Sequence, residues 1–193
     1  MRKMAEARRE LGRPSVFNYL GPLANPLGVH YQLIGLSNMK HISMLVELVQ
    51  KLPLKRVLFC CGGDGRDEVS LEGTTQCVLV EPDTVQEFEF DFKSEIADID
   101  PNYSCGNSME NAMLFLKIIM DEEWDHPVVH HIAVNAGAAL YCRGKVSSIK
   151  DGYEQAMEVF RSGDITMSIN RYKRVVANCL VLPYEETSEA QTT

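Results

Sequence analysis

Hydrophobic and polar positions follow two different periods along the chain, and the shorter period predicts strands. The segment KRVLFCC (55–61) is continuously apolar over a strand's length, which is typical of a strand buried on both faces. The segments TQCVLVE (75–81) and VQEFEFD (85–91) alternate in period two around Pro82, which predicts an antiparallel pair at a sheet edge. The segment YQLIGL (31–36) predicts a further short, buried strand.

Apolar residues spaced by three and four predict the helices. One helix, 38–52, is expected to follow Ser37 as its N-cap and to stop at Pro53. Another, 127–142, is rich in alanine and apolar nearly all round, which indicates a buried helix. Further helices are predicted at 1–12, 108–120, 149–162 and 164–180. Together these elements predict an α/β fold in which helices flank a mixed central sheet.

The length of 193 residues fits one domain of ordinary size. We expect this domain to cover residues 1–182. The polar segment 183–193 is expected to be a disordered tail.

Composition and charge narrow the classes of function. A net charge of -8 argues against binding to nucleic acid or to an anionic membrane, because both need clustered Lys and Arg. No apolar run is long enough to predict a membrane-spanning helix, and no apolar segment near Met1 resembles a secretory signal. The six cysteines lack CxxC spacing, which favours reduced and mostly buried thiols. We therefore expect a cytoplasmic protein.

The segment GGDGRDE (62–68) directly follows the buried strand 55–61, at the position where open α/β sheets place their ligands. In one interpretation it is a tight turn in which Asp64 bonds to nearby backbone. In the other, Asp67 and Glu68 hold Mg²⁺, which in turn holds a pyrophosphate. The segment is not a Walker loop, because no Gly-Lys-Ser/Thr ends it.

Several polar side chains lie in the predicted helices. Arg8 is either an ordinary surface residue or an arginine whose guanidinium fork binds a carboxylate in a bidentate manner. His130 and His131 are predicted to pack or to form hydrogen bonds, because no acid or cysteine stands at ligand spacing. Asn111 and Asn135 interrupt apolar helices and are expected to brace loops. No Ser or Cys shows a nucleophile's His/Asp constellation.

Four segments, taken together and in this order, resemble anthranilate phosphoribosyltransferases. They are RRELGRPSVFNYLGPLANP (8–26), GGDGRDEVSLEGTT (62–75), NSMENAML (107–114) and VNAGAALYCRGKVSSIKDGYEQAMEVFRSG (134–163). The resemblance implies a catalytic domain of the nucleoside phosphorylase/phosphoribosyltransferase type. It implies transfer of the 5-phosphoribosyl group of phosphoribosyl pyrophosphate (PRPP) to anthranilate in tryptophan biosynthesis, assisted by Mg²⁺. By this resemblance Arg8 contacts the anthranilate carboxylate, and Asp67 and Glu68 form the metal pair.

The departures from the family pattern concern the start of the chain. The family's pyrophosphate loop Gly-Thr-Gly-Gly-Asp and its Lys-His-Gly-Asn segment do not occur in the 193 residues. We therefore expect a domain truncated at its N-terminus, inactive or weakly active alone, whose partner is the missing N-terminal half or a homodimer mate. A plastid location remains open if the source is plant-like. Two alternatives stay open: an inactive, family-related binding module, and a relative of pyrimidine-nucleoside phosphorylase.

Overall fold

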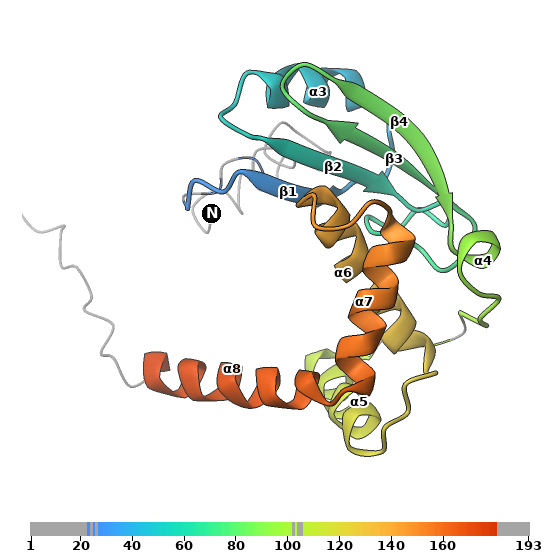
Figure 1. Ribbon diagram of the computed structural model, residues 1–193, viewed down its shortest axis with the longest axis vertical. Helices are drawn as coiled ribbons and strands as arrows, with labels where there is room; N and C mark the ends of the chain where they lie inside the picture. Colours follow the sequence, from blue (N-terminus) through green and yellow to red (C-terminus); the bar gives the residue numbers. More distant parts are fainter. Residues whose placement is uncertain (1–22, 24, 26, 102, 104–105, 181–193) are drawn as a thin grey trace, which may run out of the picture.

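The computed structural model describes residues 23, 25, 27–101, 103 and 106–180. Its described strands form one sheet in the order β1-β2-β3-β4 (Figure 1). The strands are β1 (Tyr31–Gly35), β2 (Arg56–Cys61), β3 (Thr74–Val80) and β4 (Val85–Asp91). β1 and β2 are parallel, whereas β2 pairs with β3, and β3 with β4, in the antiparallel direction. The predicted mixed sheet is confirmed, and so is the hairpin that ends in the edge strand β4.

Helices cover both faces of β2, which explains its continuous apolar run. Val57, Phe59 and Cys61 face the side covered by α3 (Ile42–Gln50), where Leu45 and Val49 are buried. Alternate residues of the same strand, Leu58 among them, join the cluster formed with α6 (Pro127–Cys142) and α7 (Ile149–Arg161). Figure 1 shows α3 on one side of the sheet and α6 with α7 on the other. The core is therefore two layers of helix around one sheet.

Most of the predicted helices begin and end where the sequence indicates. α5 (Ser108–Met120), α6, α7 and α8 (Asp164–Leu180) match the predicted ranges within a residue. Asn107 starts α5 with a reciprocal capping box to Glu110, and the Ser148 side chain caps α7. A four-residue helix, α4 (Phe92–Glu95), follows the edge strand and was not predicted. The predicted helix 1–12 and the tail 183–193 lie outside the described residues.

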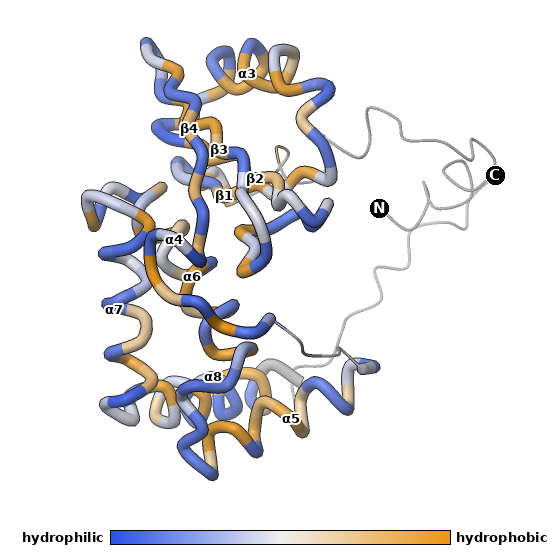
Figure 2. The backbone as a smooth tube through the Cα atoms, turned by 90° about the vertical axis from the view of Figure 1, so that its right-hand side faces the viewer, coloured by the Kyte–Doolittle hydropathy of each residue, from blue (hydrophilic) through white to orange (hydrophobic). Residues whose placement is uncertain are grey.

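The start predicted for the helix at 38–52 is wrong. α3 begins at Ile42, and its N-cap position is His41 rather than Ser37. The side chain of Asn38 accepts a hydrogen bond from the backbone N–H of Lys40 at 3.2 Å, which forms a local turn before the helix. Such Asx turns compete with helical hydrogen bonding, so the helix starts after the turn. In Figure 2 the hydrophobic positions of α3 turn toward the sheet.

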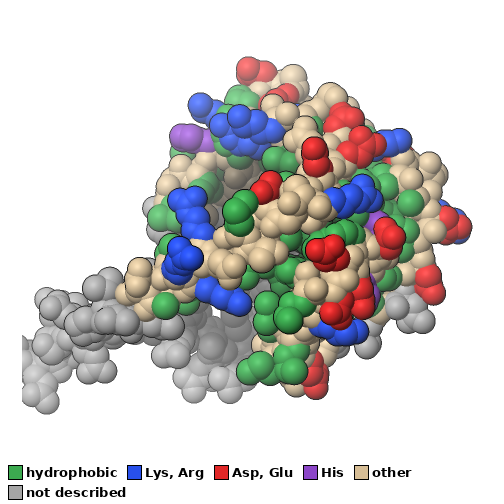
Figure 3. All heavy atoms as spheres, turned by 60° about the horizontal axis from the view of Figure 1, so that its bottom comes forward, with side chains coloured by type: hydrophobic (Ala, Val, Ile, Leu, Met, Phe, Trp, Pro, Cys, Tyr) green, Lys and Arg blue, Asp and Glu red, His purple; other side chains and the backbone are tan. Residues whose placement is uncertain are grey.

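Helices α5 and α8 leave apolar side chains at the surface. On α5, Met109, Met113 and Met120 are 69%, 64% and 81% exposed, at a spacing that places them along one side of the helix. Met167, Tyr172 and Val175 are exposed on α8. Figure 3 views the molecule from the end where these two helices lie, and it shows hydrophobic side chains beside acidic ones at the surface.

Two further expectations concern cysteines and membranes. Cys60, Cys61, Cys77 and Cys142 are buried free thiols, as predicted for them. None of the helices in the described part of the chain is both long and apolar enough to cross a bilayer.

The packing of α6 on α7 depends on two glycines. A Cβ atom on Gly137 would lie 2.4 Å from the backbone nitrogen of Tyr153, and one on Gly152 would lie 2.5 Å from the carbonyl oxygen of Gly137. Both distances are too short for carbon contacts, so the two helix backbones meet at a point that excludes any side chain. This close approach sets the position of α6 relative to α7, and α6 carries the residues that face the loop after β2.

We expect Gly137→Ala to lower the free energy of unfolding by about 1–3 kcal/mol, because the added methyl group forces the two helices apart. Urea unfolding measures this change. Ala139→Ser, at an exposed position of the same helix, is the control and should change the free energy by less than about 0.5 kcal/mol. Equal effects of the two substitutions would contradict the close-packing argument.

Candidate functional site

The loop after β2 is a tight, internally bonded turn. The backbone N–H of Gly62 donates to the carbonyl of Arg66, and that of Gly65 donates to the carbonyl of Gly62, both at 2.9 Å. Gly65 has a φ of 84°, in the left-handed region that favours glycine. Oδ1 of Asp64 accepts a hydrogen bond from the backbone N–H of Arg66 at 3.1 Å. The turn interpretation of this segment is therefore confirmed, and Asp64 is used inside the turn.

A second set of contacts ties Asp64 to the rest of the loop. Its Oδ2 atom accepts a hydrogen bond from Ser70 Oγ at 2.8 Å and lies 3.1 Å from Nε of Arg66. The backbone N–H of Ser70 in turn donates to Oγ1 of Thr75 at 3.1 Å. The first acid of the segment is thus neutralised locally, which leaves Asp67 and Glu68 as the acids directed elsewhere.

The loop passes directly over the end of β1. A Cβ atom on Gly35, the last residue of β1, would lie 1.5 Å from the carbonyl oxygen of Asp67, so only glycine fits there. Since β1 and β2 are parallel, their carboxyl ends lie at the same edge of the sheet. Asp67 is exposed at this edge, where α/β sheets commonly bind ligands.

Asn135 of α6 clamps the loop in place. Its Oδ1 accepts a hydrogen bond from the backbone N–H of Val69, and its Nδ2 donates to the Val69 carbonyl, both at 2.9 Å. Nδ2 also donates to the carbonyl of His131, one turn earlier, at 3.1 Å. Val69 is fully buried, so its backbone groups need these partners. Asn111 holds Gly106 by the same two-point pattern, at 2.8 and 3.1 Å. The predicted bracing role is confirmed for both asparagines.

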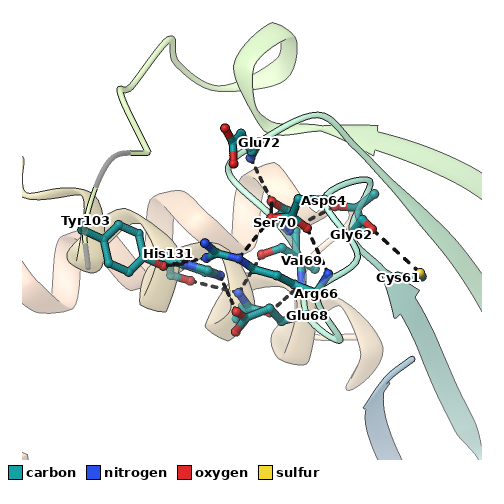
Figure 4. Close-up of polar contacts among 12 residues, drawn as sticks. Cys61, Gly62, Asp64, Arg66, Glu68, Val69, Ser70, Glu72, Tyr103 and His131 are labelled. Atoms are coloured by element: carbon teal, nitrogen blue, oxygen red, sulfur yellow. Dashed lines mark hydrogen bonds and ion pairs between the residues drawn. The ribbon is translucent and has the colours of Figure 1, made fainter. Parts of the chain in front are cut away.

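Glu68 points from the loop toward a row of polar side chains (Figure 4). Its Oε1 atom lies 3.2 Å from Nε2 of His131. Nδ1 of His131 is in hydrogen-bond contact with the hydroxyl of Tyr103, and Nη1 of Arg66 donates to that hydroxyl at 3.2 Å. The Arg66 guanidinium also lies over the Tyr103 ring, 5.7 Å from its centre.

Glu68, Tyr103 and His131 border a cavity of about 470 Å³ between the loop, α5 and α6. Its apolar wall comes from the two helices, and its polar groups come from all three elements. The lining residues are Glu68, Tyr103, Asn111, Leu114, Phe115, Val128, His131, Ile132 and Asn135. A cavity of this size, mostly apolar with a few converging polar groups, is typical of small-molecule sites.

Burial decides the protonation of the buried histidines and cysteines. It lowers the pKa of His130 and of His131, in the second case against the opposing charge of Glu68. Both imidazoles are therefore neutral at pH 7. Burial also raises the pKa of Cys60 and of Cys77 to about 12, so neither thiol is a nucleophile at neutral pH.

The donor set of the loop suits a hard cation but is small. Two neighbouring carboxylates, on exposed Asp67 and half-exposed Glu68, offer the oxygen ligands that Mg²⁺ prefers. Mg²⁺ commonly keeps several waters and binds through one or two carboxylates plus substrate phosphates. Among the described residues no group of three or more His, Cys, Asp or Glu side chains is arranged to hold a metal ion. The residues therefore fit a cation shared with a phosphate ligand rather than one enclosed by protein alone.

A family model described as "Glycosyl transferase family, a/b domain" matches residues 1–166. The chain belongs to this family. The match spans every described element up to the start of α8, so the loop after β2 and its clamp on α6 are parts of the family's a/b domain.

Curated relatives of this glycosyl transferase domain are anthranilate phosphoribosyltransferases. The enzyme of Desulfitobacterium hafniense (strain DSM 10664 / DCB-2) is 34% identical over 176 residues, which are 90% of this chain and 52% of the relative. The enzyme of Oceanobacillus iheyensis is 32% identical over 172 residues, or 88% of this chain and 50% of the relative. The chain thus spans about half the length of the curated relatives it matches.

Solved structures agree with the family assignment. The anthranilate phosphoribosyltransferase of Thermus thermophilus superposes with a TM-score of 0.73 at 30% identity, covering 89% of this chain and 51% of that one. The Saccharomyces cerevisiae enzyme in complex with PRPP and Mg superposes with a TM-score of 0.73 over 91% of this chain and 51% of that one. Its identity is 24%, so that likeness shows the fold.

The structure bears in different ways on the site residues predicted from the sequence. Arg8 lies outside the described residues, so its role stays a prediction. Asp67 and Glu68 lie at the expected edge of the sheet, and their role as a metal pair also stays a prediction. His130 and His131 form the hydrogen bonds expected of them, but their partners were not foreseen. His131 bonds to Tyr103, 28 positions away, and lies at ion-pair distance from Glu68, 63 positions away. No spacing in the sequence signals either contact.

We expect Asn135→Ala to destabilise the protein by about 1–3 kcal/mol, because it leaves the buried backbone groups of Val69 without partners. Hydrogen exchange of the Val69 amide should become faster, and urea unfolding measures the change in free energy. Asn111→Ala is the matched control, since it removes the same two-point clamp from the exposed Gly106. A Val69 amide equally protected in Asn135→Ala and wild type would contradict the clamp.

The buried His130 should make the fold sensitive to mild acid. Its imidazole bonds to the Tyr153 hydroxyl at 2.7 Å, and burial lowers its pKa from the ordinary 6.5. The unfolded chain therefore binds more protons between pH 6.5 and the lower folded pKa, and stability is lost as pH falls through that window, by up to about 1.4 kcal/mol per pH unit.

This loss is measured by urea unfolding at pH 7.5, 6.5 and 5.5. His130→Gln keeps a polar partner for Tyr153 but does not titrate, so the loss should shrink. A pH dependence unchanged by His130→Gln would refute the assignment.

Proposed function

We propose that this chain carries the metal-binding and anthranilate-binding part of an anthranilate phosphoribosyltransferase. The reaction transfers the 5-phosphoribosyl group of PRPP to the amine of anthranilate and releases pyrophosphate. The observation that carries the proposal is the pair Asp67–Glu68, exposed at the carboxyl edge of the sheet in a chain 34% identical to such an enzyme over 90% of its length. The relatives give no support to a nucleoside phosphorylase or to an inactive binding module.

In this proposal the two carboxylates hold Mg²⁺, which fits the small set of oxygen donors in the loop. When bound, the ion neutralises the charge that develops on the leaving pyrophosphate. Yeast anthranilate phosphoribosyltransferase structures with this fold hold Mg, or PRPP and Mg together, which is consistent with this role. The loop positions the two carboxylates, since its internal hydrogen bonds and the Asn135 clamp hold Asp67 and Glu68 at the carboxyl edge of the sheet.

Arg8 is proposed to bind the anthranilate carboxylate through its guanidinium, a planar fork that matches a planar carboxylate. The aromatic amine then needs position more than activation, because it attacks an anomeric carbon with oxocarbenium character. Direct attack by the amine needs no nucleophile from the protein. The high pKa of the Cys60 and Cys77 thiols is consistent with this, because neither thiol is a nucleophile at neutral pH.

The chain alone should have little or no activity, because the pyrophosphate loop Gly-Thr-Gly-Gly-Asp does not occur in its sequence. The proposal is tested in a chimera in which this chain replaces the matching half of the Desulfitobacterium hafniense enzyme. With PRPP and Mg²⁺ the chimera should consume anthranilate, measured by loss of its fluorescence. Glu68→Gln should lower kcat/KM about 100-fold or more, because transition-state charge is no longer offset.

Glu72→Gln, at an exposed acid of the same loop region, is the control and should leave the rate unchanged. A folded chimera without turnover would overturn the proposed activity. Vigorous turnover by the separate chain would overturn the prediction that it carries only part of the site.

A further inference from the structure

Three side chains beside Glu68 have no part in the function described so far. Arg66 comes from the loop, Tyr103 from the segment before α5, and His131 from α6, and they form one row that ends at Glu68 (Figure 4). The segments that supply them are far apart in sequence, and their polar atoms contact one another in succession. The chemistry of these side chains decides which of them donates and which accepts each hydrogen bond in the row.

The direction begins at Arg66, whose guanidinium can only donate. The Tyr103 oxygen therefore accepts the hydrogen bond from Arg66 Nη1, at 3.2 Å. The phenolic hydrogen of Tyr103 is then directed at Nδ1 of His131, with which the hydroxyl is in contact. A neutral imidazole that accepts at Nδ1 carries its hydrogen on Nε2. The row thus selects one tautomer of His131.

The hydrogen on Nε2 faces Glu68. Nε2 lies 3.2 Å from Oε1 of Glu68, within ion-pair distance but not aligned as a hydrogen bond. The atom is buried, and it has no hydrogen-bond partner within the described part of the chain. The Glu68 side chain is 44% exposed, so its carboxylate has room to rotate into line. A buried donor next to a movable acceptor favours that rotation.

The distance between Glu68 and His131 is set by a shared neighbour. Asn135 binds both backbone groups of Val69, the residue after Glu68, and also the carbonyl of His131. Arg66 is held as well, since its Nε lies 3.1 Å from Asp64. Both ends of the row are therefore anchored to the same loop.

We propose that Arg66, Tyr103 and His131 form a directional row of hydrogen-bond donors that holds one carboxylate oxygen of Glu68 and leaves the other oxygen for a divalent cation. All three are positioning residues, since they act on the cation through Glu68. Outer partners of this kind orient carboxylate and histidine ligands at many metal sites. The inference rests on the proposed function, because it needs Glu68 as a cation ligand.

The neighbouring residue supplies a matched control. His130 also bonds through Nδ1 to a tyrosine hydroxyl, that of Tyr153, at 2.7 Å. This second pair packs in the core against Phe92, and the Glu68 contact belongs to His131. Tyr153→Phe therefore removes the tyrosine–imidazole bond of His130, the residue next to His131, and leaves Arg66, Tyr103 and His131 unchanged.

The first test reads the tautomer without any metal. Long-range ¹H–¹⁵N spectra of the full chain at pH 7.5 should show His131 with its hydrogen on Nε2, with signals assigned by comparison with His131→Gln. In Tyr103→Phe the Nδ1–H form should appear, because nothing then donates to Nδ1. Tyr153→Phe should leave the His131 signals unchanged. A wild-type His131 in the Nδ1–H form would falsify the row.

The second test measures Mn²⁺ binding to the full chain by electron paramagnetic resonance. Tyr103→Phe and His131→Asn should weaken binding about 10- to 100-fold, the range seen when outer partners of metal ligands are removed. His131→Gln should restore most of the affinity, since its side-chain amide can donate from about the position of Nε2. Tyr153→Phe should bind as wild type does.

Glu68→Gln separates the two proposals. If it abolishes Mn²⁺ binding while Tyr103→Phe binds as wild type does, the donor row is overturned and the metal pair stands. If wild type does not bind Mn²⁺, or Glu68→Gln binds equally well, the metal pair is overturned and the role of the row toward a cation falls with it.

Discussion

The hydrogen bonds between the Asn135 side chain and the backbone of Val69 are the contact on which the candidate site depends. They join a loop to a helix 66 residues further along the chain, with both bonds at 2.9 Å. Val69 is fully buried beneath them, so water cannot substitute for the amide. Because one side chain satisfies both the donor and the acceptor of the same residue, the loop can neither slide along α6 nor rotate on it.

The clamp works only because α6 itself is fixed. Gly137 and Gly152 bring α6 and α7 into backbone contact, and both helices cover one face of β2. The loop leaves the end of the same strand and passes over Gly35 at the end of β1. The strand ends, the helix pair and the loop therefore form one unit, and Asp67 and Glu68 are displayed from a rigid base.

The two acids Asp64 and Glu68 of the loop have partners of different charge. Asp64 is neutralised inside the turn by Arg66 and by hydrogen bonds, whereas Glu68 faces a buried, neutral imidazole. A neutral partner can orient a carboxylate without cancelling its charge. The arrangement thus leaves negative charge at the sheet edge, where the proposed cation would bind.

Much of the fold could be predicted from the sequence because local signals are strong there. The unbroken apolar run 55–61, the period-two pair around Pro82 and the ranges of α5 to α8 follow from periodicity and capping, and the structure confirms them. The start of α3 was misjudged because Asn38 forms a local turn that competes with the helix. Within the site, the acids and their place after a strand were visible in the residue types alone.

Contacts between distant segments could not be foreseen in the same way. Nothing in the pair His130–His131 tells which ring enters the core with Tyr153 and which meets Glu68, since adjacent helical residues differ by about 100° in direction. Which histidine meets Glu68 depends on the position of the loop after β2 along α6. That position is set by the Asn135 clamp and by the glycine contact between α6 and α7. The sequence by itself determined the elements and the chemistry available at the strand end. The tertiary structure alone decided which groups meet, because their meeting depends on packing across the whole sheet.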